Sequence, residues 1–599
     1  MKTVLETLEE RISAAMQRAT GQEHCAAIVG PSTDPKFGDY QANGVMALAK
    51  QMKTNPRKLA EEVVKDLDVS DICEPPEVAG PGFINLRLKP NFIADRLREI
   101  NADSEDRLAI EKTTEPKTIV VDFSCPNIAK QMHVGHLRST IIGDALCRVL
   151  SFLGHKVIPQ NHIGDWGTHF GMLCALYDRE YAKAIKNGQE KFPYLPLPDI
   201  EAFYKEAKQL FDTDQEFAQE ARKAIAGLHS GDQIWMSHWR QIVRQSEEHF
   251  QEIYVKLGVL RAANNIRGES AYRDDLPNIV QDLMKNEKLK ENGLVGISDG
   301  AICVFPPGFK NKEGKALGLV IQKSDGAYLY ATTDLAALRY RVTELKADVI
   351  IYVTDARQKL HFEMLFATGR MAGWAPEDVE LVHVMFGSVL GENGQPLKTR
   401  SGENVKLKEL LDEAVSRAKT TVEEKNADLD ENRKAQIAKA VGIGAVKYAD
   451  FSNNRTSDYV FSFDKMLAMD GNTAPYMQYA YARIKSIERK AETKGVDIGT
   501  ELHDLKELSL TEPAELDLAK YLVRYGEAIE AAIADYRPNY LTSYLYELAQ
   551  KFSGFYTNCP VLDAERDKRP TRLLLCDLTA KTIRHGLSEL LGIEVVEQM

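Results

Sequence analysis

The sequence lacks any run of about 18 consecutive apolar residues, the length that a membrane-spanning helix requires, so no membrane span is predicted. Its opening stretch, MKTVLETLEERISAAMQRAT, mixes acidic and basic side chains. It has no continuous apolar core of the kind found in signal peptides. We therefore expect a cytoplasmic protein.

Cysteine is scarce, with 8 residues in 599, and no two of them form a Cys-x-x-Cys pair. Structural zinc sites usually draw their thiolates from such closely spaced pairs. No protein-bound metal is therefore expected, and the scattered cysteines are interpreted as small buried side chains.

Positive charge is also in deficit, since 76 Lys and Arg stand against 88 Asp and Glu and give a formal net charge of −12. A protein that coats nucleic acid without specificity would carry the opposite balance. An acidic body can still bind RNA through a local basic face, so this composition leaves an RNA partner open.

The length of 599 residues predicts roughly three or four domains of about 150 residues. Residues 1–115 combine helical patterns with a strand and predict an N-terminal α+β domain. Residues 116–469 alternate strands with helices, which is typical of a parallel, Rossmann-like α/β sheet, with a mostly helical insertion near 178–255. Residues 470–599 show helical periodicity throughout and predict an all-α bundle. Strands within 118–124 and 156–165, with the helix between them, predict a βαβ unit of a parallel sheet, and further strands are expected within 317–322, 348–355 and 379–390.

The stretch SCPNIAKQMHVGHLRST (124–140) lies between a predicted strand and a predicted helix. In α/β folds nucleotides bind beyond the carboxyl ends of the parallel strands, where such a stretch lies. The unpaired N–H groups at the start of the following helix favour phosphate there. His133 and His136 add hydrogen-bond donors, Gly135 would let a flat base approach the backbone, and Lys130 adds a mobile positive charge. The alternative is that the two histidines simply cap the helix.

His133-Val134-Gly135-His136 resembles the signature motif of the class I aminoacyl-tRNA synthetases, and the preceding Pro126–Lys130 resembles its arginyl-tRNA synthetase form. The resemblance implies that His133, Gly135 and His136 bind ATP. It also implies a catalytic role for Lys130, His133 and His136, with Lys130 stabilising the pyrophosphate side of the reaction.

The second class I signature, Lys-Met-Ser-Lys-Ser, is absent. Its nearest counterpart is PLKTRSG (396–402), where Lys398 and Arg400 would approach the ATP triphosphate from a loop. The absence fits arginyl enzymes with a degenerate second signature. The alternative is a basic turn on the surface.

Tyr330 and Asp334 are four residues apart in a predicted helix and therefore share one face. An acid on an apolar face needs a cation, and the chain's own Arg339 or Arg341 could supply it. The resemblance implies a different cation, the side chain of substrate arginine, because a carboxylate and an amide oxygen match the guanidinium fork. By this resemblance the arginine-binding residues are Asn127, Glu269, Tyr330, Asp334 and Gln358.

The helical C-terminal region is rich in tyrosine, and most of these side chains are explained by packing between helices. RNA bases can also stack on aromatic rings where they are unpaired. The resemblance implies contacts of Tyr476, Tyr479, Tyr556 and Met599 with the anticodon loop. It also implies that the N-terminal domain contacts the tRNA elbow.

The implied activity is that of an arginine–tRNA ligase, with L-arginine, ATP accompanied by Mg²⁺, and tRNA(Arg) as its partners, and with the protein acting as a monomer. Three alternatives remain from the residues alone. They are a class I synthetase for another amino acid, a His-x-Gly-His nucleotidyltransferase that makes a cofactor, and a non-catalytic RNA-binding relative.

Overall fold

The computed structural model describes residues 2–187, 195–259, 265–398, 405–425, 428–503, 505 and 507–599. The chain forms two compact units, one of Met1–Lys112, Met469–Glu589 and Val595–Met599, the other of Thr113–Ala468 and Leu590–Glu594. Within the described ranges, every helix is too short or too polar to cross a membrane.

The second unit is built around a four-stranded parallel sheet in the order β11-β10-β5-β6. Its strands are β5 (Thr118–Asp122), β6 (Lys156–Gln160), β10 (Val349–Tyr352) and β11 (Glu380–His383). All four residues of β10 are buried, as expected of a central parallel strand covered on both faces. The predicted parallel α/β sheet is confirmed.

The predicted strand within 317–322 is confirmed, but it belongs to a different sheet. This strand, β9 (Leu319–Gln322), pairs with β8 (Ala301–Val304), which pairs with β7 (Val295–Ser298), and both pairings are antiparallel. Burial alternates along β9, which is typical of a strand with one covered face. A short apolar run does not reveal which sheet a strand joins.

The stretch 379–390 was expected as one strand, and it forms two. β11 ends at His383, and the separate strand β12 (Val389–Leu390) pairs in parallel with β13 (Tyr459–Val460). Gly387 lies in the turn between them, and a Cβ at this position would meet the backbone of Ser457 at 2.6 Å. This close approach forces the chain out of the sheet.

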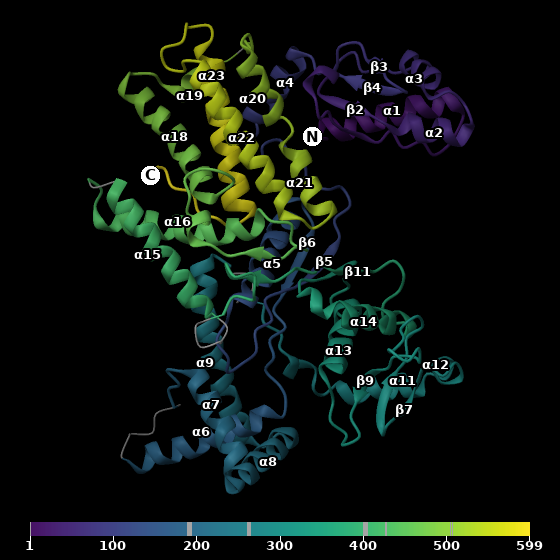
Figure 1. Cartoon of the computed structure of the whole chain (residues 1–599), viewed down its shortest axis with the longest axis vertical. Coiled ribbons are helices and arrows are strands. Elements are labelled where there is room, and N and C mark those ends of the chain that lie inside the picture. The colour runs from purple at the N-terminus through teal and green to yellow at the C-terminus, as the bar shows by residue number, and fades with distance from the viewer. Residues whose placement is uncertain are drawn as a thin grey trace. The chain divides into compact units, whose positions relative to one another are not determined.

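In Figure 1 helices lie around β5, β6 and β11, and several helices follow one another along the chain between β6 and β10. Their bounds are α5 (Val134–Phe152), α6 (His169–Lys186), α7 (Ile200–Thr213), α8 (Gln215–Ser230), α9 (Gln233–Leu257), α11 (Leu276–Lys285), α12 (Glu287–Glu291), α13 (Tyr330–Thr343), α14 (Lys359–Met371), α15 (Leu407–Lys425), α16 (Glu431–Phe451) and α17 (Phe463–Met466). Arg138 of α5 forms a buried ion pair with Asp450 of α16 at 3.0 Å. Because such a pair is costly to break once buried, it fixes α5 against its neighbours.

The first unit contains a four-stranded antiparallel sheet and a helical bundle, which confirms the predicted N-terminal α+β and C-terminal all-α folds. The sheet has the order β1-β2-β4-β3, with β1 (Val29–Pro31), β2 (Tyr40–Ala42), β3 (Glu77–Ala79) and β4 (Phe83–Leu86). Helices α1 (Val4–Thr20), α2 (Gly44–Met52), α3 (Pro56–Lys65) and α4 (Pro90–Asn101) accompany it. The bundle comprises α18 (Ala474–Thr493), α19 (Ile498–His503), α20 (Pro513–Leu522), α21 (Tyr525–Ala534), α22 (Pro538–Asn558) and α23 (Arg569–Arg584).

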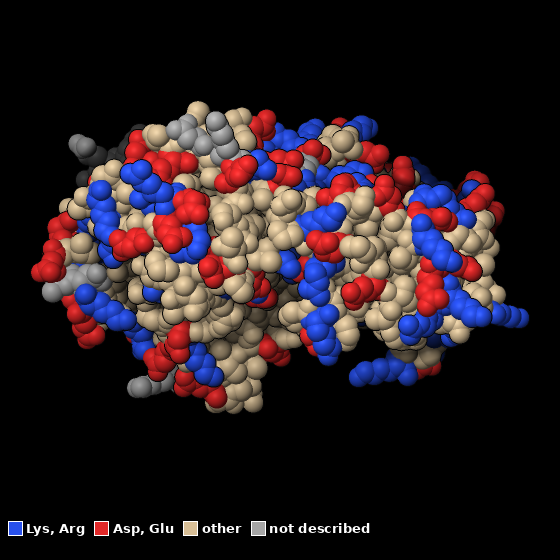
Figure 2. Space-filling model, turned by 90° about the horizontal axis from the view of Figure 1, so that it is seen from above, with Lys and Arg blue, Asp and Glu red and all other residues tan. Residues whose placement is uncertain are grey.

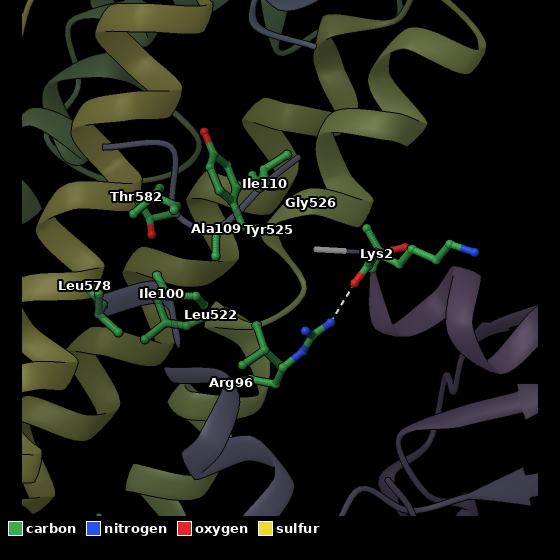
Figure 3. A pocket seen from close by; sticks show the side chains of 13 residues that line it. Lys2, Arg96, Ile100, Ala109, Ile110, Leu522, Tyr525, Gly526, Leu578 and Thr582 are labelled. Atoms are coloured by element: carbon green, nitrogen blue, oxygen red, sulfur yellow. Dashed lines mark hydrogen bonds between the residues drawn. The ribbon is translucent and has the colours of Figure 1, made fainter. Parts of the chain in front are cut away.

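Polar contacts join the N-terminal sheet to the bundle within this unit. The hydroxyl of Tyr40 donates to Glu527 Oε1 at 2.6 Å, and Lys520 pairs with Asp39 at 2.8 Å. A cavity of about 40 Å³ lies nearby, lined among others by Ile100 and Leu522 (Figure 3). It has room for water but not for a nucleotide.

Acidic and basic side chains are interspersed over the face shown in Figure 2, among the residues drawn in colour. This mixture agrees with the moderate net charge of −12. Specific binding of a polyanion therefore has to be sought in local groups of residues rather than in a broad field.

Candidate active site

Two histidines cap the amino end of α5. His133 is the N-cap residue, and its Nδ1 accepts a hydrogen bond from the Gly135 N–H at 3.0 Å. The Nδ1 of His136 accepts from the His133 N–H at 3.1 Å. Burial and the charge of Lys130 lower the pKa of His133, and burial lowers the pKa of His136 to about 3. Both rings are therefore neutral near pH 7 and carry their proton on Nε2, where it can be donated to a ligand oxygen.

The capping interpretation and the ligand-binding interpretation are thus compatible, because capping determines the tautomer. Gly135 has a part in this arrangement. A Cβ at position 135 would lie 2.8 Å from Cε1 of His133. The glycine therefore leaves room for the folded-back His133 ring, a reason for its presence beyond the predicted approach of a base.

The loop between β5 and α5 is held in an unusual backbone conformation. Ser124, Cys125 and Ala129 have φ values of 75°, 48° and 60°. The Ser124 N–H donates to Ser139 Oγ and the Cys125 N–H to Asn161 Oδ1, both at 2.9 Å. Non-glycine residues in this region carry strain that the surroundings must support, a feature common at functional sites.

Lys130 lies at the end of this loop with an exposed side chain, and its Nζ is 5.5 Å from the centre of the Tyr204 ring. The segment after the candidate second signature runs alongside, since the Val134 N–H donates to the Val405 carbonyl at 3.0 Å. Lys398 is exposed at the last described position before this segment, and Arg400 lies outside the described residues.

A group of carboxylates lies beyond the ends of β5 and β6. Asp334 on α13 accepts from His361 Nε2 at 2.7 Å, and His162 Nε2 is 3.7 Å away. Asp334 forms an ion pair with neither Arg339 nor Arg341, the two arginines that could have neutralised it. Arg339 pairs with Asp275 and Asp282, and Arg341 pairs with Asp122 at 2.7 Å.

Glu269 lies in the same group, half-buried in the turn before α11. Burial, with repulsion from Asp334 and Asp165, raises the pKa of Glu269 to about 8. A shift of this size means that the carboxylate lacks a compensating positive charge. The Glu269 carboxylate is therefore held beside Asp334 and Asp165 without a cation that offsets its burial.

The other residues expected to bind arginine come from separate segments. The Tyr330 ring is 62% exposed and lies 4.9 Å from the His361 ring. Gln358 is exposed just before α14. Asn127 bridges to Gly164, where a side chain would collide with the Asn127 amide oxygen.

Sequence reasoning missed His162 and Asp165, which it placed in a strand. β6 ends at Gln160, and the following residues form a loop that contacts the whole group. Asp165 accepts from the Ser270 N–H at 2.8 Å and its hydroxyl at 2.6 Å, beside Glu269. The available signal was the cluster of polar residues from Gln160 to Asp165, which is unusual within a buried parallel strand.

The four residues expected to contact tRNA lie in the other unit, on α18, α22 and the C-terminal tail. The Tyr476 ring is 5.6 Å from that of Tyr546, and Tyr479 is 43% exposed. The Arg483 guanidinium lies 4.5 Å from the Tyr556 ring. Met599 is half-buried, and the tail reaches α18 through a hydrogen bond from Arg489 to the Glu597 carbonyl at 3.1 Å. Packing explains the buried tyrosines at 481, 521, 525 and 544.

Three family models match the chain in succession. Residues 6–88 match the Arginyl tRNA synthetase N terminal domain, residues 100–463 the catalytic domain of tRNA synthetases class I (R), and residues 477–599 the DALR anticodon binding domain. The catalytic model alone spans more than half of the chain.

Full-length relatives agree with these matches. The chain is 48% identical to the arginine–tRNA ligase of Synechococcus sp. over 605 residues, covering 100% of both, and 48% identical to that of Hahella chejuensis over 592 residues, covering 99% of both. The arginyl-tRNA synthetase structures from Plasmodium falciparum (30% identity, TM-score 0.83) and Thermus thermophilus (26%, 0.79) match over 100% of both chains. The chain therefore belongs to the arginyl-tRNA synthetases, within class I of the aminoacyl-tRNA synthetases.

Proposed function

We propose that this arginine–tRNA ligase binds the arginine side chain between the carboxylates of Asp334 and Glu269, and binds ATP at the amino end of α5. The observation that carries the proposal is that Asp334 lies beside the imidazoles of His361, at 2.7 Å, and His162, at 3.7 Å, while Arg339 and Arg341 pair with other acids. The raised pKa of Glu269 beside it supports the same interpretation. A guanidinium is always charged and presents its donors in a planar fork, so it supplies the missing cation in the required shape.

The reaction proceeds in two displacements. The arginine carboxylate oxygen attacks the α-phosphorus of ATP in line, a P–O bond forms, and the bond to the bridging oxygen breaks to release pyrophosphate. A hydroxyl of the tRNA terminal ribose then attacks the arginyl carbonyl and releases AMP. Both steps depend chiefly on positioning and on stabilising developing negative charge.

The neutral His133 and His136 donate hydrogen bonds from Nε2 to phosphate oxygens. Lys130 stabilises the negative charge that develops on the leaving pyrophosphate. Lys398 and Arg400 bind the same phosphates. Mg²⁺ arrives with ATP, because it prefers phosphate oxygens and water to a dedicated protein cage.

Tyr330 and Gln358 hold the arginine side chain together with Asp334, and Asn127 makes a further contact with the amino acid. In the other unit Tyr476, Tyr479, Tyr556 and Met599 contact the anticodon loop. The exposed Tyr479 ring on α18 and the Arg483 guanidinium over the Tyr556 ring support this role, because unpaired bases stack on such surfaces.

The affinity for arginine should depend on pH through Glu269. Its pKa of about 8 in the free protein keeps it largely protonated at pH 7, whereas a bound guanidinium favours the ionised form. The KM for arginine should therefore fall several-fold between pH 6.5 and 8 and then level off. Steady-state kinetics across this range measures it. Glu269→Gln should abolish the slope, and an equal slope in that variant would remove Glu269 from the pocket.

Gly135→Ala tests the arrangement of the histidines. The new Cβ would lie 2.8 Å from the His133 ring, so the ring must move and lose its bond to the backbone. We expect kcat to fall by about ten-fold, since small displacements of catalytic groups are costly. Gly296→Ala, where a Cβ meets nothing within 4 Å, is the matched control. Equal kcat in both variants would contradict the role given to His133.

Aminoacylation with a panel of all twenty amino acids tests the proposed function as a whole. Purified protein, ATP, Mg²⁺ and tRNA(Arg) should yield arginyl-tRNA and no other ester. Charging with lysine at a comparable rate would show that the carboxylates of Asp334 and Glu269 do not select the guanidinium.

A further inference from the structure

Helix α7 (Ile200–Thr213) lies in the helical region between β6 and β10 to which no role has yet been given. Glu201 and Tyr204 are three residues apart near its start, so both lie on one side of the helix. One side chain contacts the loop of the first signature, and the other contacts the segment that follows the second. Tyr204 places its ring 5.5 Å from Lys130 Nζ, and Glu201 Oε2 lies 3.7 Å from Lys406 Nζ.

Each contact restrains a lysine at the edge of the site. Lys130 is exposed at the end of its loop, so its flexible stem would otherwise sample many rotamers. An aromatic face within about 6 Å attracts an ammonium group. The Tyr204 ring therefore confines Lys130 without neutralising its charge, which a carboxylate partner would do.

Among the described residues beside the Tyr204 ring, Lys130 is the charged one that the ring attracts. His169, at the start of α6, has its ring 6.5 Å from that of Tyr204. Burial and the charge of Lys130 lower the pKa of His169 to about 4, so this imidazole is neutral near pH 7. Lys406 is held separately. The N–H of its neighbour Leu407 donates to the Met132 carbonyl at 2.9 Å, and the Lys406 side chain lies beside Glu201.

We propose that α7 is a positioning element of the adenylate-forming site, in which Tyr204 holds Lys130 near the phosphates and Glu201 holds the segment that follows the second signature. This inference rests on the role given above to Lys130. It assigns to the insertion a contribution to the chemical step through the placement of two lysines.

A double-mutant cycle in ATP–pyrophosphate exchange tests this proposal. Tyr204→Leu should lower kcat by about two- to five-fold, the range of an exposed cation–π contact, with little change in the KM for ATP. Tyr204→Phe keeps the ring and should restore kcat. Tyr204→Leu should cause no further loss in a Lys130→Ala background, because coupled residues are not additive.

Lys208→Ala is the matched control, since Lys208 is exposed on the same helix and pairs with Asp212 at 2.9 Å; it should leave kcat unchanged. The inference is overturned if Tyr204→Leu retains full kcat, if Tyr204→Phe is as impaired as Tyr204→Leu, or if the loss persists undiminished in the Lys130→Ala background. Exchange that is absent in the wild type would instead overturn the proposed function, and this inference with it.

Discussion

Lys130→Ala is expected to lower the kcat of arginine-dependent ATP–pyrophosphate exchange by about 10²- to 10³-fold, the range for removal of one group that stabilises developing charge. The KM for ATP should change far less, because the interaction strengthens as pyrophosphate departs. Lys130 is the residue for which position and chemistry agree best. It lies in the loop whose first residues are held by Ser139 and Asn161, and its charge adds to burial in lowering the pKa of His133.

Lys156→Ala is a suitable control for this experiment, because Lys156 begins β6 at the opposite edge of the sheet. It should retain wild-type kcat and KM. An equal loss of kcat and of ATP affinity in Lys130→Ala would show that Lys130 binds ATP uniformly and does not act on the transition state.

Asp334→Asn is expected to raise the KM for arginine by at least about 30-fold while the KM for ATP remains unchanged. Removing one partner of a hydrogen-bonded charge pair typically costs about 2–5 kcal/mol. Asp334 is suited to this role because its carboxylate meets imidazoles, His361 at 2.7 Å and His162 at 3.7 Å, and no arginine of the described chain. Steady-state kinetics with arginine and ATP varied separately measures both constants.

Glu344→Gln provides the matched loss of one negative charge, at the exposed carboxyl end of the same helix α13. It should leave the KM for arginine unchanged. If Asp334→Asn also left that constant unchanged, Asp334 would not contact the guanidinium, and Glu269 would have to provide the selectivity by itself.

The signature helix could be predicted from sequence because its information is local. A β-branched run, a loop and His-x-Gly-His before a helical pattern follow one another within about two dozen residues, and a βαβ unit leaves few arrangements for them. The parallel sheet and the helical C-terminal bundle followed from periodicity in the same way.

The features that escaped prediction depend on contacts between distant segments. Nothing near Asp334 in the sequence indicates that His361 and His162 would be its neighbours, or that Arg341 would pair with Asp122 instead. The strand at 319–322 has an apolar pattern compatible with either sheet. The link from Tyr204 to Lys130 joins residues 74 positions apart, and a tyrosine in an amphipathic helix gives no local sign of such a contact.

Arginine-dependent ATP–pyrophosphate exchange in the presence of tRNA(Arg) tests the central claim most directly, because it reports activation of the amino acid at the signature helix. We expect exchange with arginine and none with lysine or with citrulline, which lacks the charged guanidinium but keeps its size. Exchange with citrulline or lysine at the rate seen with arginine, or no exchange with arginine, would contradict the assignment of Asp334 and Glu269 to the arginine site.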